Sequence, residues 1–278
     1  MSTSTLTVAA IQLSSQDDVE ANLTQCRQWV ERAAQAGARL VVLPENFAYF
    51  GPDETRARVA EPLTSSEAGS GPIQTALSRW ARELSLTIVG GGMPTRSADA
   101  KRPYNTAVVF APDGRLAAHY NKVHLFDVSL ADGTELCESA STTPGTSLSG
   151  VRVGGFAVGL SICYDLRFPE LYRGLVDGGA EVLLVPAAFT LHTGKDHWEP
   201  LLRARAIESQ CWVVAAAQFG THPRGRRCYG HSLIIDPWGA VVAQCPDRVG
   251  MALATIDREY LDQVRRSLPS LAHRRLSK

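Results

Sequence analysis

The chain has 278 residues, of which 45% are hydrophobic and 20% charged, so it can bury a sizeable core and is not mainly disordered. Its 28 basic residues balance its 28 acidic residues. This balance argues against nucleic acids or membranes as partners, because broad binding to them depends on excess positive charge. No apolar run has the length of a bilayer span, and the first five residues are too polar for a signal peptide.

Strand-like and helix-like segments alternate along the whole chain. Apolar runs of strand length predict strands at residues 6–13, 40–43, 86–89, 158–162, 182–185 and 212–217. Apolar residues at helical spacing predict helices at residues 19–33, 73–84, 169–177 and 197–210. We expect Gly37 to cap the first helix, and the three glycines at 90–92 to close the third strand.

Two segments predict antiparallel hairpins. Residues 107–110 lead through Pro-Asp-Gly into residues 116–119, and residues 233–235 lead through Pro-Trp-Gly into residues 241–243. Their similarity suggests related positions in two halves of one fold. Hairpins combined with parallel βα units predict mixed sheets covered by helices, and they count against a TIM barrel. Without a linker or low-complexity run, residues 1–278 are expected to form a single domain.

One of the six cysteines stands apart from the others. All six are scattered without a C-x-x-C pair, so we expect reduced thiols in a cytoplasmic protein. An apolar strand leads directly into Cys163, and a predicted helix begins at Pro169. Such a strand–turn–helix corner projects a nucleophile into a cleft, where the following backbone N–H groups can bind an oxyanion. A cysteine buried in the core is the alternative interpretation.

Lys122 and Glu45 also occupy positions that suit a reactive site. Lys122 has aromatic and apolar neighbours in residues 120–126, and a partly buried ammonium needs a negative partner. Glu45 follows Pro44, which ends a predicted strand, and α/β sheets place ligands at the carboxyl ends of their strands. Taken alone, each residue could equally be a solvated side chain of a loop.

Together, the three positions lie in motifs that resemble the nitrilase superfamily of carbon–nitrogen hydrolases. The motifs are Leu-Pro-Glu-Asn-Phe at residues 43–47, Tyr-Asn-Lys-Val-His-Leu-Phe-Asp at 120–127 and Ile-Cys-Tyr-Asp-Leu-Arg-Phe-Pro-Glu at 162–170. They occur in the family's order, and the likeness runs through nearly the whole chain. The resemblance implies an α/β fold, a four-layer α-β-β-α sandwich in which helices cover two mixed sheets. It also implies a homodimer or larger homo-oligomer.

The resemblance implies a Glu–Lys–Cys triad that hydrolyses an amide through a thioester. Cys163 attacks the carbonyl carbon, while Lys122 and the backbone N–H of Tyr164 stabilise the oxyanion. Glu45 takes the thiol proton, passes it to departing ammonia and then activates water. A second glutamate of the family corresponds to Glu138, which orients the amide or the water. No metal or organic cofactor is implied, and the expected partner is a small-molecule amide.

Within the superfamily, the chain resembles the Nit branch at residues 188–199, 202–218, 229–232 and 236–239. This implies hydrolysis of the side-chain amide of a 2-oxo acid or peptide, with deaminated glutathione as the expected substrate. The alternatives are 2-oxoglutaramate, an N-carbamoyl compound or a nitrile. The implied substrate-binding residues are Arg167, Phe189, Thr190, Thr193 and His197. Further candidates to bind the acidic end of a peptide are Arg173, Arg224, Arg226 and Arg227.

Three other interpretations remain open from the sequence. His124 could pair with Cys163 in a cysteine–histidine hydrolase, although Glu45 and Lys122 would then be unexplained. The histidine pairs 192 and 197, or 222 and 231, could ligate a metal, although their spacings match no standard site. A non-catalytic scaffold is possible, but the intact triad argues against it.

Overall fold

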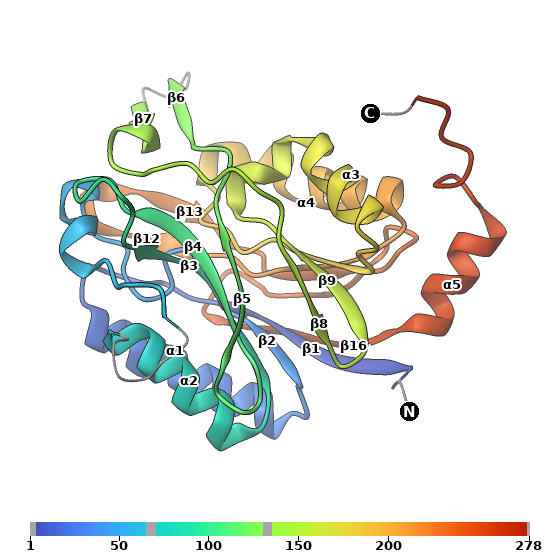
Figure 1. Cartoon of the computed structure of the whole chain (residues 1–278), viewed down its shortest axis with the longest axis horizontal. Helices are drawn as coiled ribbons and strands as arrows, with labels where there is room; N and C mark the ends of the chain where they lie inside the picture. The colour runs from blue at the N-terminus through green and yellow to red at the C-terminus, as the bar shows by residue number, and fades with distance from the viewer. Residues whose placement is uncertain (1–3, 65–70, 130–134, 277–278) are drawn as a thin grey trace.

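Two six-stranded sheets lie face to face, and helices cover their outer faces (Figure 1). The structure is a computed structural model that describes residues 4–64, 71–129 and 135–276. The first sheet has the order β16-β1-β2-β3-β4-β5, with β1 (Thr5–Gln12), β2 (Leu40–Val42), β3 (Thr87–Thr95), β4 (Tyr104–Phe110), β5 (Leu116–Asn121) and β16 (Gly250–Asp257). The second has the order β15-β14-β11-β10-β9-β8, with β8 (Gly150–Val153), β9 (Phe156–Leu160), β10 (Val182–Leu184), β11 (Trp212–Ala215), β14 (Leu233–Ile235) and β15 (Val241–Gln244).

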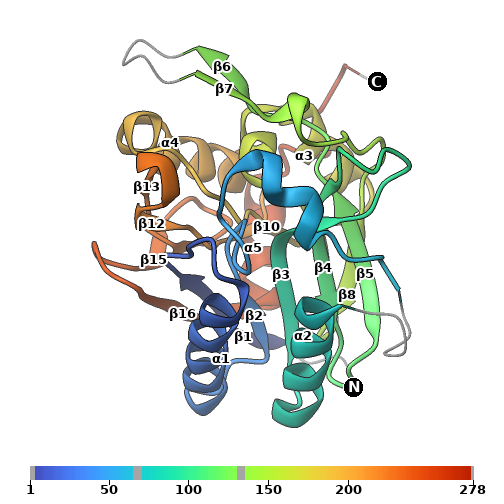
Figure 2. The same cartoon turned by 90° about the vertical axis from the view of Figure 1, so that its left-hand side faces the viewer.

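Helices and short ribbons complete the architecture. The α-helices are α1 (Val19–Gln35), α2 (Pro72–Leu84), α3 (Pro169–Asp177), α4 (Leu191–Ser209) and α5 (Arg258–Ser267). The two-stranded ribbons pair β6 (Asp127–Ser129) with β7 (Glu135–Cys137), and β12 (Phe219–Thr221) with β13 (Arg227–Tyr229). The 3-10 helices are η1 (Asp53–Val59), η2 (Glu138–Ala140), η3 (Cys163–Arg167) and η4 (Pro223–Gly225). Figure 2 looks onto the end of the sheets around which both ribbons and η1 are arranged.

The helices α1 and α2 pack on the first sheet, and α3 and α4 pack on the second (Figure 1). The strand β1 shows why apolar runs form these sheets: Ile11 belongs to the core beneath α1 and α2, whereas Val8 belongs to the core between the sheets. Because both faces of the strand are buried, its sequence is a continuous apolar run. The four-layer sandwich predicted from the sequence is confirmed; that residues 1–278 form one domain stays a prediction.

The two sheets repeat one arrangement. In the first, β1, β2 and β3 are parallel and are followed by the antiparallel strands β4 and β5. In the second, β9, β10 and β11 are parallel and are followed by the antiparallel strands β14 and β15. The turns contain Gly114 and Gly239, with φ of 82° and 94°, which is the left-handed region that favours glycine. The predicted hairpins and their related positions are confirmed.

The prediction that the glycines at 90–92 end the third strand was wrong. Instead, β3 continues through them to Thr95, with a register shift between Gly90 and Met93. A Cβ on Gly91 would lie 2.1 Å from the carbonyl oxygen of Leu43 and 2.2 Å from the Cβ of Pro186. Gly91 therefore allows the two sheets to approach each other closely where β2 and β10 end.

The long helix α4 begins six residues before the predicted start at residue 197. Thr190 is its N-cap, and the hydroxyl of Thr190 accepts a hydrogen bond from the N–H of Thr193. Pro200 lies well inside the helix, although proline is best tolerated in a first turn. The predicted start was therefore six residues too late, because the helix runs on both sides of Pro200. By contrast, α3 has the predicted bounds, and Gly37 follows α1 with φ of 89° as expected.

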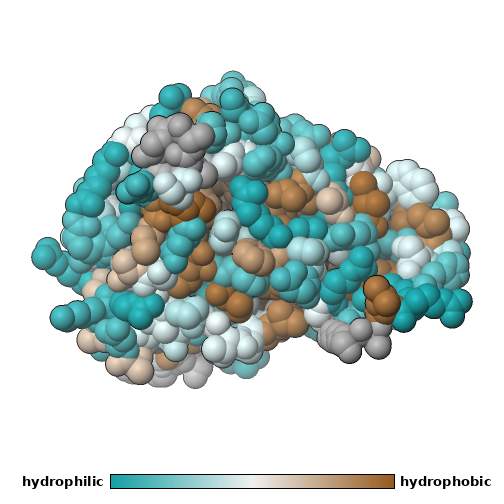
Figure 3. Space-filling model, turned by 90° about the horizontal axis from the view of Figure 1, so that it is seen from above, coloured by the Kyte–Doolittle hydropathy of each residue, from teal (hydrophilic) through white to brown (hydrophobic). Residues whose placement is uncertain are grey.

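The face formed by α3 and α4 carries apolar patches between hydrophilic ones (Figure 3). Ile207 on α4 is 47% exposed, and Leu148, which packs against Gly174 of α3, is 46% exposed. Whether a second copy covers this face is untested, so the homodimer stays a prediction. Among the described residues, no helix combines the length and the apolar character that a membrane span requires.

Candidate active site

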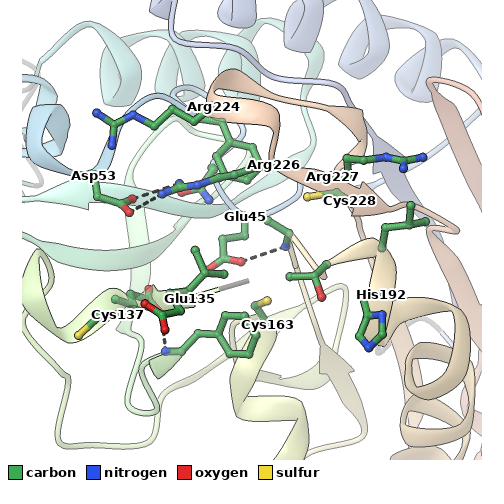
Figure 4. A pocket seen from close by; sticks show the side chains of 18 of the residues that line it. Glu45, Asp53, Glu135, Cys137, Cys163, His192, Arg224, Arg226, Arg227 and Cys228 are labelled. Atoms are coloured by element: carbon green, nitrogen blue, oxygen red, sulfur yellow. Dashed lines mark hydrogen bonds and ion pairs between the residues drawn. The ribbon is translucent and has the colours of Figure 1, made fainter. Parts of the chain in front are cut away.

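An open cavity of about 810 Å³ lies at the carboxyl ends of the parallel strands. Glu45 follows β2, Lys122 follows β5 and Cys163 follows β9, so three distant segments reach one edge of the sandwich. All three residues line the cavity together with Glu138. The structure therefore brings the four predicted catalytic residues together, and Figure 4 shows Glu45 and Cys163 among the side chains that line the cavity.

Glu45 is 4% exposed and uses both carboxylate oxygens. Its Oε1 accepts hydrogen bonds from the Nζ of Lys122 at 3.0 Å and the Nδ2 of Asn105 at 2.8 Å. Its Oε2 accepts one from the backbone N–H of Ala188 at 2.9 Å. Burial favours a raised pKa for Glu45, but the charge of Lys122 and hydrogen bonds, including one from the Cys163 thiol, lower the pKa below its ordinary value. Glu45 is therefore a carboxylate at neutral pH.

Lys122 is 2% exposed and lies between two carboxylates. Its Nζ is 3.0 Å from Oε1 of Glu45 and 2.8 Å from Oε2 of Glu138. Burial favours a lowered pKa for Lys122, but the charges of Glu138 and Glu45 raise the pKa above its ordinary value. Lys122 therefore keeps its positive charge despite its burial. Asn105 completes this network, because its Nδ2 also lies 3.3 Å from Oε1 of Glu138.

Cys163 is the first residue of η3, at the sharp turn that follows β9. Its φ of 49° lies in the left-handed region, which is rare for a side chain other than glycine, and its backbone N–H donates to the carbonyl of Pro186 at 2.9 Å. Burial raises the pKa of the thiol well above its ordinary value, and the Glu45 carboxylate raises it further against the opposing charge of Lys122. The resting thiol is therefore protonated and lies beside an ionised carboxylate that can accept its proton.

The backbone N–H of Tyr164 belongs to the first turn of η3, where N–H groups have no partner within the helix. The Tyr164 side chain is part of an aromatic group with Phe126 and Phe168. The residue thus sits directly beside the Cys163 turn, as the predicted oxyanion donor requires.

Most of the predicted substrate-binding residues lie outside the cavity wall. Thr190 lines the cavity, but Arg167, Phe189, Thr193 and His197 do not. Phe189 packs on Trp198, with ring centroids 5.1 Å apart. Arg167 lies over the Phe189 ring, and its Nη1 is 3.4 Å from the Nδ1 of His197. Although Arg167 is only four residues from Cys163, its guanidinium is thus held against the aromatic residues beside α4.

The loop that joins β12 to β13 forms part of the cavity wall. Arg224, Arg226 and Arg227 all line the cavity, whereas Arg173 does not. Both guanidinium Nη atoms of Arg226 contact the carboxylate of Asp53 in η1 (Figure 4). The Nη2 of Arg224 pairs with Oε1 of Glu54. These ion pairs join η1 to the β12–β13 ribbon across 170 residues of sequence.

His222 and His231, which could have ligated a metal, make other contacts. The Nδ1 of His222 lies 2.7 Å from the backbone oxygen of Ser15, and the ring of His231 stacks on Tyr229. In the part of the chain that the structure describes, no three His, Cys, Asp or Glu side chains group so that they could hold a metal ion.

Three supporting residues were missed in the sequence. Asn105 lies on β4, and Arg56 lies in η1, in segments without any motif. Asp165 belongs to the cysteine motif, but nothing in the sequence shows that it is fully buried and contacts the lysine segment. Only the position of Asp165, two residues after Cys163, could have drawn attention to it.

The chain belongs to the carbon–nitrogen hydrolase family, whose model matches residues 7–266. Among its relatives is the deaminated glutathione amidase of Synechocystis, which is 46% identical over 269 residues, 96% of this chain and 97% of the relative. The human deaminated glutathione amidase is 45% identical over 96% of this chain and 82% of its own length. The Caenorhabditis elegans NitFhit protein has a solved structure with a TM-score of 0.91 and 41% identity; the match covers 99% of this chain and 66% of that longer one. The predicted family and its amide-hydrolysing class are confirmed.

Proposed function

We propose that the protein is an amidase that hydrolyses deaminated glutathione with Cys163 as nucleophile, Glu45 as general base and Lys122 as oxyanion donor. One observation carries the catalytic assignment: the Glu45 carboxylate accepts a hydrogen bond from the Lys122 ammonium and lies near enough to the Cys163 thiol to raise the pKa of that thiol, and all three residues line one cavity. A protonated thiol beside an ionised carboxylate is the starting state that general-base-assisted attack requires.

In the first half-reaction, Cys163 Sγ bonds to the carbonyl carbon while its proton moves to Glu45. The oxyanion is stabilised by Lys122 and the backbone N–H of Tyr164, and one such donor contributes about 3–4 kcal/mol. Glu45 then gives the proton to the amide nitrogen, the C–N bond breaks, and a thioester remains on Cys163.

In the second half-reaction, Glu45 takes a proton from water, whose oxygen attacks the thioester carbon. The C–S bond breaks, and the proton returns to the sulfur of Cys163. Glu138 contacts Lys122 and the backbone N–H of Phe126, so it holds the ammonium in place at the cavity and can orient the amide or the water.

The proposed substrate rests on the relatives and on the shape of the cavity. Deaminated glutathione amidases are 45–46% identical to nearly the whole chain. The cavity is open and large enough for a peptide-sized amide, and cationic side chains of Lys195 and Arg227 line it. Cleavage of deaminated glutathione gives 2-oxoglutarate and cysteinylglycine. The leaving group is therefore the amine of a dipeptide, not the ammonia expected from the sequence.

A direct assay tests this function. Purified protein is incubated with deaminated glutathione, and 2-oxoglutarate and cysteinylglycine are quantified, with Cys163→Ala as the inactive control. The same preparation is given 2-oxoglutaramate, which would release ammonia. We expect a higher kcat/KM for deaminated glutathione, because binding of the peptide portion can stabilise the transition state. A preference of tenfold or more for the shorter amide, about 1.4 kcal/mol, would replace this assignment with an ω-amidase.

We further propose that the protein acts as a cytoplasmic homodimer. The partly exposed apolar side chains of Ile207 and Leu148 on the α3–α4 face support an interface there. Molar mass from light scattering would test the dimer, and replacing Ile207 with Glu should shift the protein to monomers if this face is the interface.

A further inference from the structure

Arg56 is a buried cation in the wall of the cavity. It lies in η1, is 6% exposed, and lines the same cavity as Glu45 and Cys163. Its Nη1 donates a hydrogen bond to the Oδ1 of Asn46 at 2.9 Å. Because Asn46 directly follows Glu45, this bond holds the guanidinium on the Glu45 side of the cavity.

Among the described residues, the charge of Arg56 has no acidic partner, and its Nε and Nη2 are buried without any acceptor. A buried charge without compensation costs free energy, which a bound anion would recover. The neighbouring arginines of the wall differ in this respect. Arg226 is paired with Asp53. Arg224 is paired with a carboxylate as well.

The unused donors of Arg56 have the geometry that suits a carboxylate. Nε and Nη2 lie on one edge of the planar guanidinium, and this edge binds a carboxylate through two parallel hydrogen bonds. We propose that Arg56 binds the 2-oxo-acid carboxylate in the acyl half of the substrate, an inference that rests on the function proposed above.

Because Arg56 is buried, we assign it to the acyl half of the substrate rather than to the departing dipeptide. After the first half-reaction, this half stays attached to Cys163, whereas the dipeptide must leave the cavity. Lys195 and Arg227 also line the cavity but are exposed, so they suit the carboxylate of the half that departs. A buried cation next to Asn46 suits the half that is held through both chemical steps.

Three substrates and two variants test the assignment. Arg56→Met removes the guanidinium, and Arg58→Met is the matched control, because Arg58 is an exposed arginine of the same η1 helix outside the cavity. The substrates are deaminated glutathione, 2-oxoglutaramate and N-(4-oxopentanoyl)-cysteinylglycine, in which a methyl group replaces the acyl carboxylate.

We expect Arg56→Met to lower kcat/KM about 30-fold or more for the two carboxylate-bearing acyl groups, as loss of a charge-assisted bond requires. The 4-oxopentanoyl substrate should change less than threefold, and Arg58→Met should change none of the three. An equal loss on the 4-oxopentanoyl substrate would show a structural role for Arg56. A loss on deaminated glutathione alone, without one on 2-oxoglutaramate, would place Arg56 at the departing half. Either result overturns the proposal.

A measurement without turnover separates this inference from the proposed function. 2-Oxoglutarate should slow the alkylation of Cys163 by iodoacetamide in the wild-type protein and in Arg58→Met, but not in Arg56→Met. If the wild type fails to cleave deaminated glutathione, the proposed function fails, and this protection still tests Arg56. Equal protection of both variants overturns the inference. If Arg56→Met does not fold, Arg56→Lys keeps the charge but cannot form two parallel hydrogen bonds to a carboxylate. The ratio of kcat/KM for deaminated glutathione to kcat/KM for the 4-oxopentanoyl substrate should then fall about tenfold.

Discussion

The Nδ1 of His124 lies 2.7 Å from the Oδ1 of Asp165, and the backbone N–H of His124 donates to the same oxygen at 3.0 Å. The other oxygen of Asp165 accepts hydrogen bonds from the hydroxyl of Tyr120 at 2.8 Å and the N–H of Ile162 at 2.9 Å. Asp165 thus links the segment that carries Lys122 to the turn that carries Cys163. The His124 ring also stacks on Phe168, with centroids 3.6 Å apart.

This arrangement contradicts the cysteine–histidine alternative raised by the sequence. His124 faces Asp165 and Phe168, and it is not among the residues that line the cavity. We therefore expect His124→Gln to keep kcat within about tenfold of wild type, because a glutamine amide can still donate to Asp165. A general base contributes about 10²- to 10⁴-fold, so a loss of that size in steady-state kinetics would restore His124 as the base.

The nucleophile is tested by removing its sulfur. Cys163→Ala should abolish hydrolysis while the protein stays folded, because only one small buried side chain is lost. Cys163→Ser should be nearly as inactive, since a hydroxyl ionises far less readily beside Glu45. Product formation and thermal melting are measured on the same samples. Normal turnover by Cys163→Ala would exclude Cys163 as the nucleophile.

Glu45→Gln should separate catalysis from thiol reactivity. The substitution removes the proton acceptor, so amide turnover should fall about 10²-fold or more. It also removes a negative charge and a hydrogen bond that raise the pKa of Cys163, while Lys122 still favours the thiolate. Labelling of Cys163 by iodoacetamide should therefore persist or accelerate at neutral pH. The rates of turnover and of labelling are measured side by side on Glu45→Gln and wild type. If both rates fall together, Glu45 supports the local structure and is not the proton acceptor.

The sequence predicted the sandwich, and it predicted that Glu45, Lys122 and Cys163 meet at one site, because both predictions depend on local signals. Strands buried on two faces are continuous apolar runs, and the triad lies in contiguous motifs. The residues that complete the site have no such signal. Asn105 joins Glu45 and Glu138 only because β4 begins at the edge where β2 ends, and this relation exists only in the assembled sheet.

The same reason explains why most of the predicted substrate-binding residues do not line the cavity. Arg167 is close to Cys163 in sequence, but the contacts of its guanidinium with Phe189 and His197 hold it outside the cavity wall. Arg56 is more than a hundred residues from Cys163, yet it lines the cavity because η1 packs against β3 and Arg56 donates a hydrogen bond to Asn46, in the segment that follows β2. Distance along the chain is a poor guide to the wall of a site that several loops build.

Lys122→Met should destabilise the protein in a way that depends on pH. In the wild type, the pKa of Glu45 is lowered, so its contribution to stability is present above the unfolded value of about 4.3 and is lost as the pH falls through the folded pKa. Without Lys122, two carboxylates lose their cation, and breaking a buried pair costs about 3–5 kcal/mol.

The sign of the dependence follows from the reversed shift of Glu45 in the variant. Burial, the largest influence on Glu45, would then raise its pKa above the unfolded value. When the pKa of Glu45 is higher in the folded state, Glu45 contributes fully to the free energy of unfolding below its unfolded pKa. This contribution is lost as the pH rises through its folded pKa. The deficit of Lys122→Met relative to wild type should therefore be smaller at pH 5 than at pH 8. Urea unfolding at both values measures it, with the exposed Lys101→Met as control. An equal deficit at both pH values would mean that Lys122 stabilises the fold by packing and does not compensate the two carboxylates.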